Sequence, residues 1–101
     1  MKNINLIFDG AVDDVDVICV PSEIADNLLD VANLYFSWMH NNIDEHSYWV
    51  LGNNGTKILC YETESFIWWI NNHYSQPGCN KQAFIVLQHT HLAAEYPIVN
   101  F

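Results

Sequence analysis

Apolar and polar positions follow each other along this chain with the spacings of short strands and of two helices. β-branched and aromatic runs bounded by turn residues are typical of strands, whereas apolar residues that recur every three or four positions are typical of helices. These patterns predict strands over residues 3–8, 15–20, 47–51, 56–61 and 83–87, and helices over residues 22–42 and 63–74. The second helix is expected to end before Pro77-Gly78.

Two pairs of these strands are close enough in sequence to form hairpins. An acidic turn beginning near Gly10 joins the first pair, and Asn54-Gly55, a strong hairpin signal, lies between the strands of the second pair. The C-terminal segment contains Pro97, so we expect it at a sheet edge if it pairs at all. No repeat or linker-like stretch divides the chain. We therefore predict a single α+β domain over residues 1–101, with a mainly antiparallel sheet of about five strands and two helices packed on one face.

The composition excludes several classes of function. Half of the residues are apolar and only 15% are charged, as in a folded domain and unlike a disordered chain. Three basic residues against 12 acids give a formal charge of −9, so we expect no direct binding to nucleic acid and no attraction to an anionic membrane. The apolar run at residues 4–8 is shorter than a signal peptide requires. Three widely spaced cysteines fit reduced thiols, which favours a cytoplasmic protein.

Candidate catalytic or metal-binding residues are few. His89 and His91 would point the same way on a strand and could bind a metal from one face, but Glu95 and Cys79, the nearest further ligands, have no motif spacing. The acidic turn at residues 9–16 lacks the pattern of a calcium-binding EF-hand loop. Nucleophile and phosphate-binding motifs are missing as well. We therefore expect no enzymatic activity, no metal and no cofactor, with a small histidine-dependent metalloenzyme as an alternative.

Two adjacent tryptophans provide a candidate contact residue for a protein partner. On a helix, neighbouring side chains point about 100° apart, so Trp68 and Trp69 cannot both face the core equally. One of them should be partly exposed, and exposed large aromatic residues are enriched at protein interfaces. We assign that role to Trp68, with ordinary core packing as the alternative.

The distribution of acids is the feature that folding explains least. Nine of the 12 acids fall within residues 1–45. They gather in the turn at residues 9–16, along the outer side of the first helix and in the loop after that helix. If the first hairpin packs beside the helix, these groups would merge into one acidic surface suited to a positively charged partner. The alternative is that they are scattered and serve only solubility.

Several segments resemble a known type of family. They are residues 6–10, 12–17, 48–51, 66–70 and 84–90. Together with the small size, acidity and dense aromatic residues, they resemble the small acidic immunity proteins of bacterial toxin–immunity pairs, including those of contact-dependent growth inhibition. The resemblance indicates no subfamily. It implies that the chain binds and inactivates a cognate toxin domain, often a nuclease, and it carries over no catalytic residue.

These observations together predict an immunity protein. It would neutralise a basic toxin domain, expected to be a nuclease, through stoichiometric and electrostatically steered binding. The residues expected to contact the partner are Asp13, Asp14, Asp16, Asp26, Asp30, Asp44, Glu45, Trp49 and Trp68. The alternative is a phosphate-mimicking anti-defence protein that blocks a nucleic-acid-binding complex by the same physics.

Overall fold

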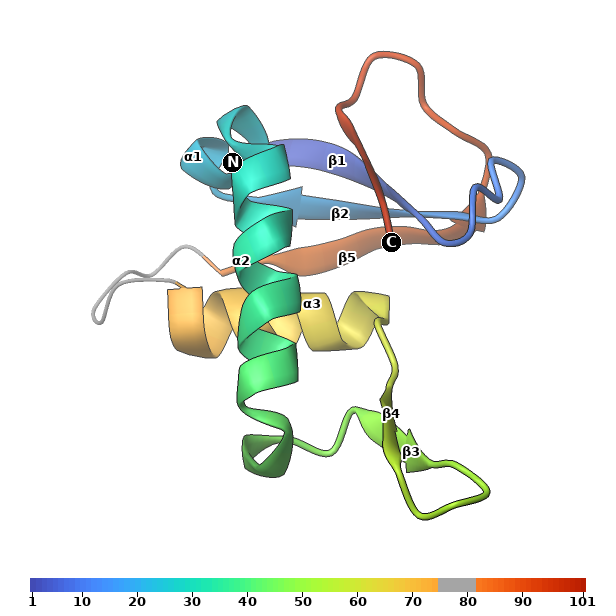
Figure 1. Cartoon of the computed structure of the whole chain (residues 1–101). Helices are drawn as coiled ribbons and strands as arrows, with labels where there is room; N and C mark the ends of the chain where they lie inside the picture. Colours follow the sequence, from blue (N-terminus) through green and yellow to red (C-terminus); the bar gives the residue numbers. More distant parts are fainter. Residues whose placement is uncertain (75–81) are drawn as a thin grey trace.

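In the computed structural model, which describes residues 1–74 and 82–101, helices pack against one face of a four-stranded sheet (Figure 1). The strands are β1 (Lys2–Ile7), β2 (Val15–Val20), β5 (Phe84–Thr90) and β6 (Ile98–Asn100), in the order β5-β2-β1-β6. β2 pairs antiparallel with β1 and with β5, whereas β6 runs parallel to β1. The predicted α+β class is confirmed, and so is the hairpin of β1 with β2. The sheet is mixed, because the edge segment after Pro97 enters it parallel to β1.

The first predicted helix is two helices. They are α1 (Ser22–Asp26) and α2 (Leu28–Asn41), followed by a short 3₁₀ turn, η1 (Ile43–Glu45). Asn27 breaks the run with φ −127° and ψ 36°, and its side-chain Nδ2 donates to the carbonyl oxygen of Glu23 at 2.9 Å. The second predicted helix consists of α3 (Thr63–Trp69) and a π-helical turn, η2 (Ile70–Tyr74). The break predicted at Pro77-Gly78 lies outside the described residues.

The helices in the described part of the chain are short. α2, with 14 residues, is the longest helix that the structure describes, and a membrane-spanning helix needs about 20 residues. Throughout residues 1–74 and 82–101, no helix has both the length and the apolar character of a membrane span.

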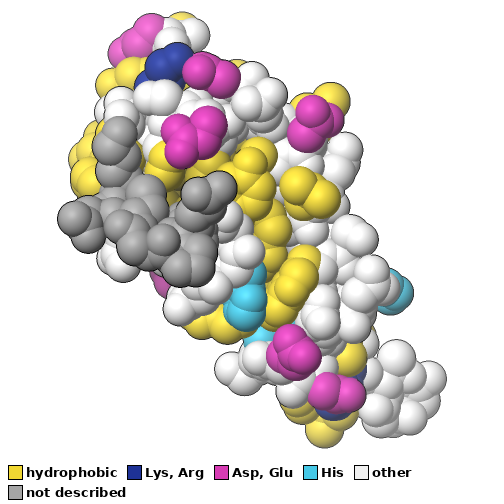
Figure 2. All heavy atoms as spheres, turned by 90° about the vertical axis from the view of Figure 1, so that its left-hand side faces the viewer, with side chains coloured by type: hydrophobic (Ala, Val, Ile, Leu, Met, Phe, Trp, Pro, Cys, Tyr) yellow, Lys and Arg dark blue, Asp and Glu magenta, His cyan; other side chains and the backbone are white. Residues whose placement is uncertain are grey.

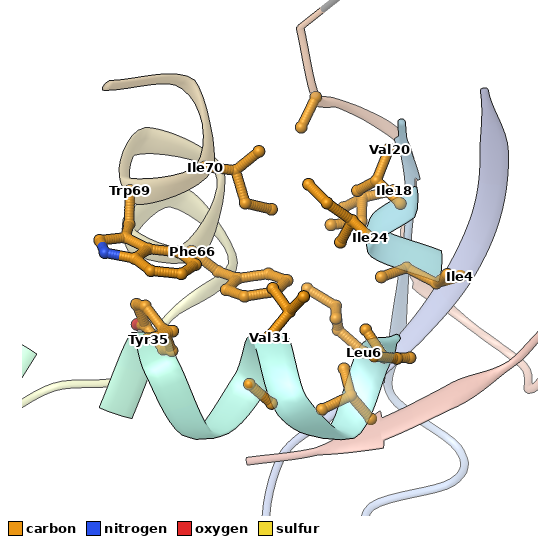
Figure 3. Packing of buried hydrophobic residues seen from close by; sticks show 14 of the residues in the cluster. Ile4, Leu6, Ile18, Val20, Ile24, Val31, Tyr35, Phe66, Trp69 and Ile70 are labelled. Carbon is orange, nitrogen blue, oxygen red and sulfur yellow. The ribbon is translucent and has the colours of Figure 1, made fainter. Parts of the chain in front are cut away.

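One hydrophobic core lies between the sheet and the helices (Figure 3). Alternate residues of the two central strands face α2 and α3, and the largest fully buried members of the core are Ile4, Leu6, Ile18, Ile24, Tyr35, Met39, Phe66 and Ile70. Burying a side chain of this size contributes about 1.5–3 kcal/mol. The Tyr35 hydroxyl lies 2.6 Å from Ser65 Oγ, so the one polar group of that ring is satisfied inside the core. This contact ties α2 to the start of α3.

The opposite face of the sheet is crossed by the connection from β5 to β6. These strands are at the two edges of the sheet, so residues 91–97 must pass over β2 and β1 (Figure 1). Asn5, fully buried on β1, holds this segment: its Nδ2 donates to the carbonyl oxygens of Ala93 at 2.8 Å and Tyr96 at 3.2 Å. Its Oδ1 accepts from the backbone N–H of Ala93 at 3.3 Å. A buried asparagine thus replaces the strand pairing that the crossing segment lacks.

The predicted second hairpin forms, but it does not join the main sheet. β3 (Trp49–Leu51) and β4 (Lys57–Leu59) make a separate two-stranded sheet that projects away from the other strands (Figure 1). The expectation of one five-stranded sheet was therefore wrong. The physical reason is that β6 already occupies the edge of β1, and the hairpin follows the end of α2 that lies away from the sheet (Figure 1). Val50, Leu51 and Ile58 are each more than half exposed.

Candidate partner-binding site

An acidic groove lies where the β1–β2 turn, the end of β5 and the start of α3 meet. These three segments are on the right-hand side of Figure 1. Its volume is about 410 Å³. Five acidic residues line it, together with the aromatic rings of Phe8 and Tyr61: Asp9, Asp14, Asp16, Glu62 and Glu64. Carboxylates beside aromatic faces suit a lysine or arginine side chain, since the ring attracts the cation and the apolar stem packs against it.

Asp16 holds the three segments of the groove together. Its Oδ2 accepts from the hydroxyl of Thr63 at 2.5 Å, and its Oδ1 accepts from the backbone N–H of His89 at 3.1 Å. His89 lies at a bulge of β5 and has a φ of +52°, a conformation uncommon for a side chain of this size. One carboxylate of β2 therefore fixes both α3 and β5, so Asp16 is a structural as well as an electrostatic residue.

The acidic groove contains one partly compensating group, the His89 side chain. Its Nδ1 lies 2.7 Å from Asp14 Oδ1, and this hydrogen bond and charge raise the pKa of His89 above its usual value. Both lysines that the structure describes lie elsewhere: Lys2 pairs with Asp26 at 2.5 Å, and Lys57 pairs with Asp44 at 2.6 Å. The carboxylates of the acidic groove thus remain without a lysine partner in the described chain.

The histidines predicted as metal-ligand candidates contact acids of the β1–β2 turn. His91 Nδ1 lies 4.0 Å from Asp13 Oδ1, and His89 contacts Asp14. Cys79 lies outside the described residues. Among the residues that are described, no group of three or more histidine, cysteine, aspartate or glutamate side chains is placed to hold a metal ion. The carboxylates are instead spread along the acidic groove.

The predicted contact residues do not gather on one surface. Asp14 and Asp16 line the acidic groove, and Asp13 is exposed in the same turn. The other acids lie on α1, on α2 and in η1: Asp26, Asp30, Asp44 and Glu45. In Figure 1 the β1–β2 turn is on the right, α1 is at the upper left and η1 follows the lower end of α2. The strands of the first hairpin lie beside the start of α2, but the acidic turn that joins them points away from this helix (Figure 1). The acids of the turn and those of the helix therefore do not merge into one surface.

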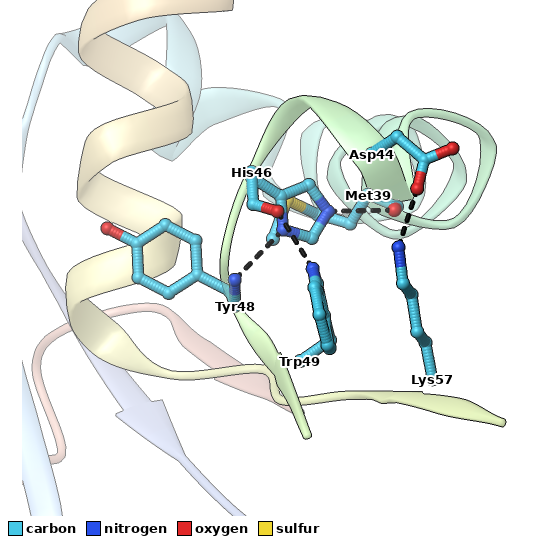
Figure 4. Close-up of polar contacts among 6 residues, drawn as sticks. All are labelled: Met39, Asp44, His46, Tyr48, Trp49 and Lys57. Carbon is cyan, nitrogen blue, oxygen red and sulfur yellow. Dashed lines mark hydrogen bonds and ion pairs between the residues drawn. The ribbon is translucent and has the colours of Figure 1, made fainter. Parts of the chain in front are cut away.

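Trp49 is held by contacts within the chain (Figure 4). Its Nε1 donates to the carbonyl oxygen of His46 at 2.9 Å, and the ammonium of Lys57 lies 4.4 Å from the centre of its ring. Lys57 also pairs with Asp44, and this contact lowers the pKa of that carboxyl. This cluster joins the hairpin to η1. The polar edge of the Trp49 ring is already occupied by its hydrogen bond to His46, and one face of the ring is occupied by Lys57.

Trp68 is half-buried, whereas Trp69 is only 3% exposed, as the helical spacing of two adjacent tryptophans predicts. The Trp68 ring packs edge-on against Trp38, with 5.8 Å between ring centres, and lies 5.6 Å from Tyr48. Trp68 therefore belongs to an aromatic surface between α3 and the lower half of α2. No described contact links it to the acidic groove.

Glu62 and Glu64 were missed as contact residues by the sequence analysis. They flank Thr63, and the chain brings Thr63 to Asp16 across 47 positions. Their place in the groove depends on how α3 packs on the sheet, which no local pattern specifies. The available signal was two acids beside the threonine that opens the second helix.

Comparison of the chain with protein-family models, with curated proteins and with solved structures gives no match.

Proposed function

We propose that this chain is an immunity protein that neutralises a basic toxin domain, a nuclease, by stoichiometric binding, and that the acidic groove receives the cationic side chains of that domain. The observation that carries the proposal is the acidic groove itself: five acidic residues line one concave surface, and the lysines of the described chain pair with acids elsewhere. Such an arrangement costs stability through like-charge repulsion, which a partner of opposite charge would relieve.

The physics of nuclease recognition fits the same groove. Proteins that bind nucleic acid contact phosphates with arginine and lysine side chains. Carboxylates can form charge-assisted, often bidentate hydrogen bonds with the same arginines. The groove would thus compete with the phosphates of the substrate for those side chains. The field of a chain with a formal charge of −9 would also speed the encounter at low salt.

An immunity gene is expected to follow the gene of its toxin, so the test uses the protein encoded directly upstream of this gene, purified and mixed with the chain. We expect a one-to-one complex that suppresses the activity of the toxin. The double variant Asp9→Asn with Glu64→Gln should slow association about tenfold at low salt, a difference that narrows as salt rises. Asn tolerates the positive φ of Asp9, and neither carboxylate has a hydrogen bond that the structure describes.

The matched control removes two charges from outside the groove. Glu23 and Glu95 are exposed on α1 and on the segment between β5 and β6, and Glu23→Gln with Glu95→Gln changes the net charge by the same amount. Equal slowing by both double variants would assign the effect to net charge alone and overturn the role of the acidic groove. Absence of a complex would overturn the immunity function.

A further inference from the structure

A second concave surface lies at the other end of α3. It is a groove of about 380 Å³ between the outer side of α2 and the π-helical turn η2, which we call the tryptophan groove. Leu34, Trp38 and Asn41 line it from α2, and Trp69, His73 and Tyr74 line it from α3 and η2. π-helical turns frequently occur at functional sites. In this strongly acidic protein, none of the described residues that line the tryptophan groove is an aspartate or a glutamate.

The tryptophan groove contains a hydrogen-bond donor without an acceptor. Trp69 is 3% exposed, and its Nε1 has no hydrogen-bond partner among the described residues. Figure 3 shows this nitrogen on the edge of the ring that is turned away from Phe66. Trp69 is the one lining residue of the tryptophan groove that belongs to the hydrophobic core. Nε1 thus lies on the ring edge that Phe66 does not cover, in a residue that lines the tryptophan groove. By contrast, the Nε1 of Trp49 already donates to His46. Buried polar groups are almost always paired, so the unpaired N–H of Trp69 is an exception that a hydrogen-bond acceptor in the tryptophan groove would remove.

The apolar and charged positions around the tryptophan groove lie on one side of α2. Asp30, Leu34, Trp38 and Asn41 are spaced four, four and three residues apart, so they share a helix face. Asp30 is exposed, and no salt bridge to it occurs in the described part of the chain. Figure 2 shows hydrophobic side chains along the middle of this side of the molecule, with acidic ones toward its upper and lower ends. An apolar centre with a charged rim is the usual composition of a protein interface.

We infer that the tryptophan groove binds an exposed segment of a basic partner protein. An apolar side chain of that segment lies between Trp38 and Tyr74, a neighbouring backbone carbonyl accepts from Trp69 Nε1, and a lysine or arginine pairs with Asp30. The tryptophan groove requires an apolar side chain and, next to it, a hydrogen-bond acceptor. A peptide segment provides both, because it carries a backbone carbonyl beside every side chain. The inference rests on the proposed function, which supplies the basic protein partner.

Entry of the carbonyl requires a small movement in the tryptophan groove. Nε1 is screened from water in the free protein, and the ring in contact with Trp69 at this end of the helix is Tyr74, with 5.4 Å between ring centres. Tyr74 is half-buried at the end of η2, so its ring is placed to turn aside. Trp38, on the α2 side of the groove, is held in place because its ring packs on that of His73, with 4.2 Å between ring centres.

The test uses short peptides and needs no toxin. Asp30 and Trp38 are eight residues apart, which is about 12 Å along a helix, and residues four apart in an extended peptide span about 13 Å. The probe is therefore acetyl-Arg-Gly-Gly-Gly-Phe-amide, and its controls are acetyl-Arg-Gly-Gly-Gly-Ala-amide and acetyl-Gln-Gly-Gly-Gly-Phe-amide. The measurement follows the four indole N–H signals of the ¹⁵N-labelled chain by NMR, with Trp69→Phe and Trp49→Phe to assign two of them.

We expect the Trp69 indole signal to move downfield as the first peptide is added, while the Trp49 signal stays in place. The alanine peptide should bind at least tenfold more weakly. Asp30→Asn should weaken binding of the arginine peptide severalfold without changing that of the glutamine peptide. A Trp69 signal that does not move at millimolar peptide, or that moves equally with the alanine peptide, would overturn the inference.

The acidic groove serves as the internal control of this experiment. The double variant Asp9→Asn with Glu64→Gln should bind the arginine peptide as the wild type does. The peptide titration therefore tests binding at the tryptophan groove, whereas the mixing experiment with the toxin tests the proposed function. If the double variant loses peptide binding, the peptide enters the acidic groove, and the inference is wrong.

Discussion

At the scale of single residues, His89 is the group whose ionisation reports on the acidic groove. Its imidazole meets Asp14 at 2.7 Å on an exposed surface, and this contact raises its pKa above the usual value. A histidine with a raised pKa in the folded state stabilises the fold below its unfolded pKa, and that contribution is lost as the pH rises through the folded pKa. The acidic groove therefore becomes more negative as the pH rises past this value.

The prediction for His89 concerns its titration. Asp14→Asn keeps a hydrogen-bonding side chain but removes the charge, so the pKa of His89 should fall toward its usual value. NMR titration of the imidazole carbon-bound protons measures the change. Asp13→Asn is the matched control, since Asp13 makes its contact with His91, and it should leave the pKa of His89 unchanged. A wild-type His89 that titrates at its usual pKa would contradict the prediction.

Residue patterns predicted neither Asn5 nor Asp16 as a structural link. Asn5 interrupts an apolar strand, and its function becomes visible only when residues 93 and 96 cross above it. Asp16 could be assigned to an acidic turn, but its hydrogen bond to Thr63 depends on packing between distant elements. Local sequence indicates that such polar residues are unusual in a strand. The contacts that satisfy them are set by the topology.

At the scale of elements, periodicity located the helices and strands but not their breaks or partners. Apolar spacing continues through Asn27 because Ile24 and Leu28 face the same core, so the break between α1 and α2 has no signature in the pattern. Turn residues specified the β3–β4 hairpin, since Asn-Gly is a local signal. Whether that hairpin joins a larger sheet depends on where α2 places it and on which edges are occupied, and β6 takes the edge of β1.

The independence of the hairpin is testable through its turn. Gly55 has a φ of +78°, which a residue with a Cβ adopts at a cost of about 1–2 kcal/mol. Gly55→Ala should therefore speed amide hydrogen exchange in β3 and β4 at least fivefold, because each 1.4 kcal/mol is a factor of ten. Exchange in β1 and β2 should not change. Gly55→Asn, which tolerates positive φ, should have the smaller effect. Equal acceleration in β1 would show that the two sheets unfold together.

At the scale of the whole molecule, the surplus of negative charge acts on stability as well as on binding. The formal charge is −9, and the two described lysines each neutralise an acid outside the acidic groove. Repulsion among the remaining carboxylates opposes the compact state and is screened by salt. A surface built from such carboxylates therefore lowers the free energy of unfolding of the free protein.

Urea unfolding at several sodium chloride concentrations measures that loss. The free energy of unfolding should rise with salt, and Glu64→Gln should raise it by up to about 0.5 kcal/mol at low salt. Asp26→Asn is the control, because Asp26 has Lys2 as its partner and its removal relieves no repulsion. Stability that is flat or falls with salt would place the carboxylates too far apart to repel one another.

The pairing of β1 with β6 also determines when the protein can finish folding during synthesis. Residues 5–7 need residues 98–100 as their neighbours, so β1 keeps an open edge until residues 98–100 have left the ribosome. The segment that Asn5 anchors arrives at the same late moment. Open strand edges invite pairing with other chains. Translation speed over the codons for residues 90–101 should therefore affect the yield of folded protein more than its final stability.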